Sequence, residues 1–229
     1  MILTYYTATT LIIIAYLLGS IPSAVWIGKK YYGIDIREHG SKNAGTTNML
    51  RVLGKRAALP VFGLDVLKGF VAVTIIDLMK YDSVFADGAN ETWFYILRFI
   101  AVFAAVLGHI FPIFAGFRGG KGVACMCGMV LALTPVLVLP LLAVIFLCGV
   151  IFNRASLLPL LTAALYVPAY YLWTGNGGVA LLLCLLPLTM LFTHRKNLFT
   201  HLPETPFRTM VFHHNLDECI ERKGPEERS

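Results

Sequence analysis

The stretch GVACMCGMVLALTPVLVLPLLAVIFLCGVIF, residues 122–152, decides how often this chain can cross a membrane. One crossing takes about 20 apolar residues, so the stretch is too long for a single membrane helix. Thr134 and Pro135 interrupt it near its middle, and Pro140 follows. Proline removes a backbone donor and ends or kinks a helix. We therefore predict two short helices, joined by a tight turn, in place of one long helix.

The composition of the whole chain indicates that lipid is its solvent. Of its 229 residues, 57% are apolar and 14% are charged, whereas an average soluble domain is about 25% charged. This excludes a soluble enzyme and predicts an all-α, polytopic membrane bundle. The net charge of +6 is expected to orient the chain in the membrane and not to bind nucleic acid, because short basic loops beside apolar segments are typical of membrane topology.

Five further apolar runs supply the remaining crossings. The first run has no Lys or Arg before it, which a cleaved signal peptide would need, so we predict that it is one retained helix. The runs cover residues 8–28, 57–79, 93–117, 157–173 and 178–193. Together with the divided stretch they give seven helices, with five or six as the alternatives.

The charges between the runs alternate as seven crossings require. The loop 29–56 carries seven basic residues and is expected on the cytoplasmic side, whereas the loop 80–92 is mainly acidic. The basic residues of the later loops then fall on the inner side as well: Arg118, Lys121, Arg154, Arg195 and Lys196. We predict an outer N-terminus and a cytoplasmic C-terminus, with one transmembrane domain at residues 1–197 and a cytoplasmic tail at 198–229.

The first cytoplasmic loop contains GSKNAGTTNMLRVLGK, residues 40–55, whose composition suits a phosphate group. It combines three glycines with small hydroxyl and amide side chains and three cations. A tetrahedral anion needs many hydrogen-bond donors and a compensating charge. On composition alone, a solvated loop that only keeps its charge on the inner side explains the same residues equally well.

A second motif, FRGGKGVA at residues 117–124, begins another apolar run. Gly119 and Gly120 precede Lys121 at an expected helix start, which predicts an anion cradle of free amides, helix dipole and cation. The spacing is not that of a P-loop. Taken alone, the motif is explained better as a cytoplasmic turn with one orienting lysine.

Other polar residues lie in or beside the apolar runs. In THRKN, residues 193–197, His194 and Asn197 are three residues apart and share a helix face. Asp65 and Lys68 have the same spacing and are expected to form an internal ion pair. For His109 we expect a structural role, with one ring nitrogen bonded to a neighbouring helix. We expect no metal site, because Cys125 and Cys127 face different ways on a helix.

These motifs resemble those of the acyl-phosphate:glycerol-3-phosphate acyltransferases, which are integral membrane enzymes of bacterial phospholipid synthesis. The resemblance extends to about Asn197 and includes YLLGSIPSA, LDVLKG and GHIFPIFAGFRGGKGVA. It implies a seven-helix bundle in the bacterial cytoplasmic membrane, with an active site on the cytoplasmic face and no cofactor. The implied reaction transfers a fatty acyl group from acyl phosphate to the 1-hydroxyl of glycerol 3-phosphate, giving lysophosphatidic acid and phosphate.

The resemblance also assigns residues and partners. It implies substrate binding by Ser41, Asn43, Arg51 and Lys121, to which the cradle adds Gly119 and Gly120, and catalytic roles for Ser156, His194 and Asn197. Lys42 replaces the usual glycine of the first motif, and the third motif departs from the family pattern after Asn197. The general base is left open between His194 and a substrate phosphate. The implied partners are the two substrates, membrane lipid and the enzyme that supplies acyl phosphate.

An alternative from another class is a transporter or flippase for an organic phosphate. A transporter should place its charged binding groups near the midplane of the bilayer. The motifs of this chain are predicted to lie in loops at one membrane surface, which favours the enzyme.

Overall fold

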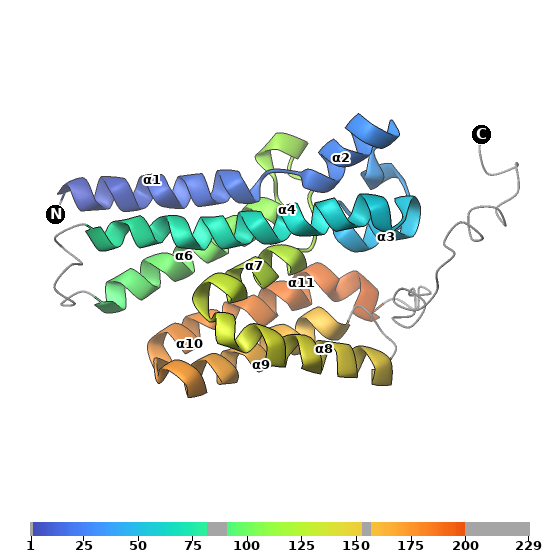
Figure 1. Cartoon of the computed structure of the whole chain (residues 1–229). Helices are drawn as coiled ribbons and strands as arrows, with labels where there is room; N and C mark the ends of the chain where they lie inside the picture. Colours follow the sequence, from blue (N-terminus) through green and yellow to red (C-terminus); the bar gives the residue numbers. More distant parts are fainter. Residues whose placement is uncertain (1, 82–90, 153–156, 200–229) are drawn as a thin grey trace, which may run out of the picture.

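The computed structural model describes residues 2–81, 91–152 and 157–199, and within these ranges the chain is a bundle of α-helices (Figure 1). The α-helices are α1 (Ile2–Gly19), α2 (Ser23–Tyr32), α3 (Thr46–Leu53), α4 (Lys55–Thr74), α6 (Glu91–Ile110), α7 (Val123–Leu133), α8 (Val138–Phe152), α9 (Leu157–Thr174), α10 (Gly177–Leu183) and α11 (Leu185–Phe199). Short 3₁₀ turns lie at Ile36–Glu38, Ile75–Tyr81, Ile113–Ala115 and Pro135–Leu137. The all-α prediction is confirmed.

Five helical segments in the described part of the chain are long and apolar enough to cross a membrane. They are Tyr5–Tyr32, Lys55–Met79, Thr92–Ala115, Leu157–Thr174 and Gly177–Arg195. Two shorter apolar helices, Val123–Leu133 and Pro135–Ile151, come from the stretch that begins at Gly122. The predicted division of that stretch is confirmed, since α7 ends at Leu133 and a turn begins at Pro135. The total of seven crossings stays a prediction.

The first apolar run, 8–28, is not one helix as predicted. Helix α1 ends at Gly19 and α2 begins at Ser23, with Ile21 and Pro22 in a break between them. Pro22 has no backbone N–H to continue the hydrogen-bond ladder. The carbonyl of Ile21 accepts a hydrogen bond from Lys68 Nζ at 2.9 Å, so a side chain of α4 holds the break in place.

The expected pair of Asp65 and Lys68 is confirmed. Lys68 Nζ lies 2.7 Å from Asp65 Oδ1, and both side chains are buried. Ser23 at the start of α2 also donates its hydroxyl to Asp65. His109 lies near this carboxylate, with Nδ1 3.7 Å from Asp65 Oδ1, but Nδ1 makes no hydrogen bond with any described residue. The hydrogen bond expected for this histidine is therefore absent at Nδ1.

Helix α7 packs directly on α4 through two glycines. A Cβ atom added at Gly69 of α4 would overlap the carbonyl oxygen of Cys125, and one added at Gly128 of α7 would overlap that of Val66. Small residues let two helix backbones approach closely, which is common between membrane helices. This contact fixes the position of α7 along the bundle.

The polar motifs gather at one end of the bundle. Helix α3, the N-terminus of α7 and the C-terminal end of α11 all lie toward the end opposite to the N-terminus of α1 (Figure 1). The sequence places the first, second and third motifs at these three points. The fold therefore brings segments far apart in the sequence to the same part of the molecule.

Candidate active site

The first motif is a folded segment organised by Asn48, and not only the polar loop that its composition suggested. Asn48 is buried in the first turn of α3. Its Nδ2 donates to the carbonyls of Ile36 and His39, both at 3.0 Å, and its Oδ1 accepts from the backbone N–H of Ser41 at 2.8 Å. Asn48 was part of the motif but was not predicted as a site residue. It positions the segment that carries Ser41.

Arg37 joins the first loop to the second motif. Its Nη1 donates to the carbonyl of Ala115 at 2.6 Å, while Nε and Nη2 bind the carboxylate of Asp35 at 2.9 and 2.7 Å. These hydrogen bonds hold the pKa of Asp35 well below its usual range. Lys29 completes the cluster with its Nζ 3.2 Å from Asp35. Sequence reasoning missed Arg37, whose hydrogen bonds to Asp35 and to the Ala115 carbonyl bring two motif loops together.

Replacing Arg37 with alanine should lower the free energy of unfolding by about 1.5–3 kcal/mol, because the hydrogen bonds from a partly buried charged group are lost. Thermal unfolding in detergent micelles measures this. Lys29→Ala is the matched control, since the Lys29 side chain is 57% exposed and an exposed ion pair contributes only about 0–1 kcal/mol. Equal melting temperatures for the two variants would contradict the role given to Arg37.

In the second motif, the glycine amides are not free as the cradle requires. The N–H of Gly119 donates to Ile110 O at 3.2 Å and that of Gly120 to His109 O at 3.1 Å. These bonds fold the loop back on the end of α6. A Cβ atom added at Gly120 would lie 2.8 Å from the carbonyl oxygen of Ala44, so this glycine permits close contact with the first motif. The binding of substrate by Gly119 and Gly120 stays a prediction. The backbone N–H groups of these two glycines cannot donate to a substrate while they are bonded to the carbonyls of α6.

The second motif ends at the N-terminus of α7. Lys121 precedes the helix, and Gly122 caps it with φ of 88°. The first N–H groups of a helix have no partner within it, and the helix dipole favours an anion there. This end of the helix lies close to α11, because a Cβ atom at Gly122 would be 3.6 Å from Met190 Cε. The second motif therefore lies beside α11, one helical turn before His194 of the third motif.

His194 is buried beside this helix end. Its Nδ1 lies 3.0 Å from the carbonyl of Met190, and the charge of Lys121 is close enough to act on the ring. Because a carbonyl oxygen only accepts hydrogen bonds, Nδ1 carries the proton of the neutral ring in this contact, which makes Nε2 the acceptor. The imidazole is thus oriented by its own helix, with Nε2 as the nitrogen that can accept a proton.

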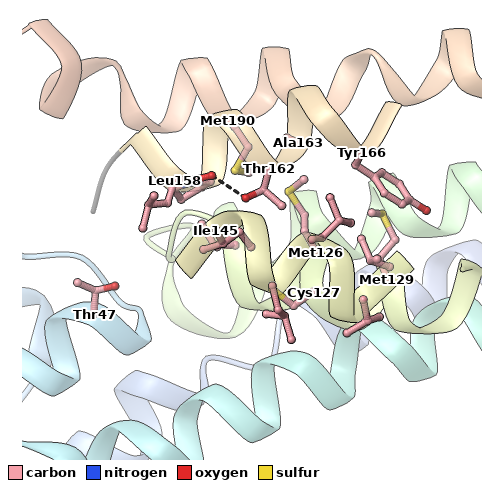
Figure 2. Close-up of a pocket in the computed structure, with 16 residues that line it drawn as sticks. Thr47, Met126, Cys127, Met129, Ile145, Leu158, Thr162, Ala163, Tyr166 and Met190 are labelled. Atoms are coloured by element: carbon pink, nitrogen blue, oxygen red, sulfur yellow. Dashed lines mark hydrogen bonds between the residues drawn. The ribbon is translucent and has the colours of Figure 1, made fainter. Parts of the chain in front are cut away.

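An apolar cavity of about 250 Å³ extends from this cluster into the bundle (Figure 2). Three of its lining residues come from the three motif-bearing elements: Thr47 from α3, Val123 from the start of α7, and Met190 from α11. The rest of its wall consists mainly of apolar side chains of α7, α8 and α9. Such a lining suits a hydrocarbon chain and not a charged group.

Comparison with known proteins gives the family. The glycerol-3-phosphate acyltransferase family model matches residues 9–202 of this chain. Glycerol-3-phosphate acyltransferase 3 of Bacillus anthracis is 44% identical over 193 residues, which is 84% of this chain and 90% of the relative. The chain belongs to the glycerol-3-phosphate acyltransferase family. The glycerol-3-phosphate acyltransferase of Bacillus subtilis (strain 168) is also similar, with 40% identity over 188 residues, 82% of this chain and 90% of the relative.

The fold agrees with solved structures of this acyltransferase family. The crystal structure of PlsY, an integral membrane glycerol 3-phosphate acyltransferase, in its glycerol 3-phosphate form has a TM-score of 0.69 and 32% identity, covering 83% of this chain and 90% of that one. Its lysophosphatidic acid form has a TM-score of 0.68 and the same identity, covering 83% and 89%. The chain is therefore a multi-pass integral membrane acyltransferase, and the family resemblance seen in the sequence is confirmed.

The structure places most of the residues predicted for the acyltransferase site. Ser41 and Asn43 lie in the loop before α3, and Arg51 lies in its last turn. Burial lowers the pKa of the half-buried Arg51 guanidinium, so this cation is partly removed from water. Asn197 belongs to α11, but its side chain is outside the described part of the structure. Ser156, Arg154 and the tail from residue 200 lie outside the described residues altogether.

Proposed function

We propose that the chain transfers a fatty acyl group from acyl phosphate to the 1-hydroxyl of glycerol 3-phosphate, releasing phosphate and giving lysophosphatidic acid. One observation carries this proposal: a single apolar cavity is lined by Thr47, Val123 and Met190, one from each motif-bearing element. Thr47 lies one turn before Arg51 on α3, and Val123 lies two positions after Lys121, so a substrate with a phosphate group at one end and an acyl chain at the other fits a cavity that begins beside these cations.

The chemistry of the reaction agrees with the residues at the mouth. The substrate hydroxyl attacks the acyl carbonyl carbon, the bond from that carbon to the phosphate oxygen breaks, and phosphate leaves with the bonding electrons. An acyl phosphate is a mixed anhydride with a good leaving group. The protein therefore has to position two anions, offset their repulsion and stabilise an oxyanion, and it needs no covalent nucleophile. Arg51 and Lys121 supply the positive charge for this task.

The proton of the attacking hydroxyl needs an acceptor. His194 Nε2 is one, since the contact of Nδ1 with the Met190 carbonyl leaves it as the accepting nitrogen. The phosphate of a substrate is the other. We assign phosphate binding to Ser41, Asn43, Arg51 and Lys121, with Gly119 and Gly120 shaping the second motif, and keep Ser156 and Asn197 as further members of the site. The hydroxyl of Thr46, at the start of α3, is buried with no hydrogen-bond partner among the described residues, which suits an additional contact to a substrate oxygen.

We further propose that the chain crosses the bacterial inner membrane seven times, with the site on the cytoplasmic face. The charge pattern of the loops and the gathering of the motifs at one end of the bundle support this orientation. On that face the enzyme that makes acyl phosphate is the expected partner, because it supplies the acyl donor.

The reaction can be tested with protein purified in detergent. We expect phosphate release only when acyl phosphate and glycerol 3-phosphate are both present, without added CoA or metal ions. Acyl-CoA in place of acyl phosphate is the control donor. Turnover with acyl-CoA and none with acyl phosphate would refute the proposed donor, whereas binding of glycerol 3-phosphate without any acyl transfer would favour the transporter.

A further inference from the structure

We propose that Tyr166, held in place by a hydrogen bond with Thr134, forms the floor of the apolar cavity and limits the length of the acyl chain that the enzyme accepts. This inference rests on the proposed function, because it takes the acyl chain of acyl phosphate as the occupant. It assigns a selective role to Tyr166, at the end of the cavity remote from the charged motifs.

The direction of the cavity follows from helix α7. Its lining residues on this helix extend from Val123, two positions after Lys121, to Val130. At 1.5 Å per residue this is about 10 Å along the helix axis. An acyl group that reacts beside Lys121 would therefore direct its chain along α7, away from the charged end. In Figure 2, Thr47 lies at one side of the cavity and Tyr166 at the other.

The far end of the cavity is closed by a bonded pair of side chains. Tyr166 of α9 lines the cavity and is only 1% exposed. Its hydroxyl lies 3.1 Å from Thr134 Oγ1, and Thr134 is the residue that directly follows α7. Behind it on α9, the ring of Tyr170 packs edge-on against Tyr166 with 6.0 Å between the centroids. The hydrogen bond and this ring contact hold the Tyr166 side chain in one position.

The surroundings of the floor also oppose a longer chain. Arg98 of α6 donates through Nη2 to the carbonyl of Ala132, in the last turn of α7, at 3.3 Å. Its Nε lies 3.3 Å from Asp77 Oδ1. A hydrocarbon chain that passed the end of α7 would meet this ion pair and would desolvate it without offering hydrogen bonds in return. The apolar cavity therefore ends where a charged environment begins.

The test compares kcat/KM for a series of saturated acyl phosphates from decanoyl to stearoyl. For each enzyme, kcat/KM for a chain two carbons longer than the wild-type optimum is divided by kcat/KM at that optimum. Tyr166→Ala should raise this ratio about tenfold, because two further methylene groups can then be buried. Tyr171→Ala is the matched control, because Tyr171 is a tyrosine of the same helix that is 51% exposed and does not line the cavity; its profile should keep the wild-type optimum.

A second variant tests the opposite change in case Tyr166→Ala does not fold. Ala163 lines the cavity one turn of α9 before the floor, so Ala163→Val narrows the space and should shift the optimum toward shorter chains. A wild-type enzyme inactive with every acyl phosphate would refute the proposed function itself. An active enzyme whose length profile is the same in the folded Tyr166 and Ala163 variants would refute the floor alone.

Discussion

Lys68→Ala should lower the free energy of unfolding by about 3–5 kcal/mol. The carboxylate of Asp65 is 2% exposed and lies 2.7 Å from Lys68 Nζ, so the variant leaves a buried negative charge without its cation. It also removes the donor to the Ile21 carbonyl at the break between α1 and α2. Denaturant-induced unfolding in detergent micelles, followed by circular dichroism, measures the loss.

Two further variants separate the charge from the shape of the side chain. In the double variant Asp65→Asn with Lys68→Met both charges are absent, so much of the lost stability should return, because replacing both members of a buried pair costs less than removing one. Lys30→Ala, at an exposed position of α2, controls for the loss of a lysine. If Lys68→Ala unfolded at the same denaturant concentration as Lys30→Ala, the buried pair would have no part in stability.

Arg51→Ala and Lys121→Ala should each lower kcat/KM for acyl transfer at least tenfold. A charge-assisted hydrogen bond to a partly desolvated phosphate is worth roughly 1.5–3 kcal/mol, and about 1.4 kcal/mol corresponds to a factor of ten. The Arg51 guanidinium is partly removed from water, and this burial lowers its pKa. Steady-state phosphate release at varied concentrations of both substrates gives the constants.

The controls for these variants distinguish a phosphate ligand from a charge that only orients the chain. Lys30→Ala and Arg56→Ala remove exposed cations of the same segment and should change kcat/KM little. Arg51→Lys should still be impaired, because an ammonium group cannot reproduce two parallel hydrogen bonds of a guanidinium. Near-wild-type kinetics in both alanine variants, with normal membrane insertion, would show that neither residue binds substrate phosphate.

Local sequence signals predicted parts of the fold well. The division at Thr134 and Pro135 and the pair of Asp65 with Lys68 depend on residues a few positions apart, which the sequence displays directly. Pro22 carried the same signal as Pro135, but the apolar run continues on both sides of it, and hydropathy alone does not mark a bend. The structure places the break there because side chains of α4 bind the residues on either side of it.

The contacts that assemble the site were less accessible to sequence reasoning. Arg37 binds the carbonyl of Ala115, which lies 78 positions away, and Asn48 binds the carbonyls of Ile36 and His39. A backbone carbonyl that accepts a hydrogen bond can belong to any residue type, so no sequence motif predicts this contact. The sequence predicted free amides at the glycines of the second motif, but these amides serve the packing of the loop on α6, which only the tertiary structure decides.

The close packing of α7 on α4 has a consequence for how this enzyme can diversify. Helix α7 has only 11 residues, with the proposed anion site at its first turn and the proposed floor next to its last turn. Because Gly69 and Gly128 leave no room between the two backbones, α7 cannot slide or tilt to lengthen one end without disturbing the other. If both proposals hold, the helix sets a constant distance between the phosphate site and the end of the acyl chain. A lineage that must alter the fluidity of its membrane would therefore change product length by resizing single side chains at the floor, while the charged end stays as it is.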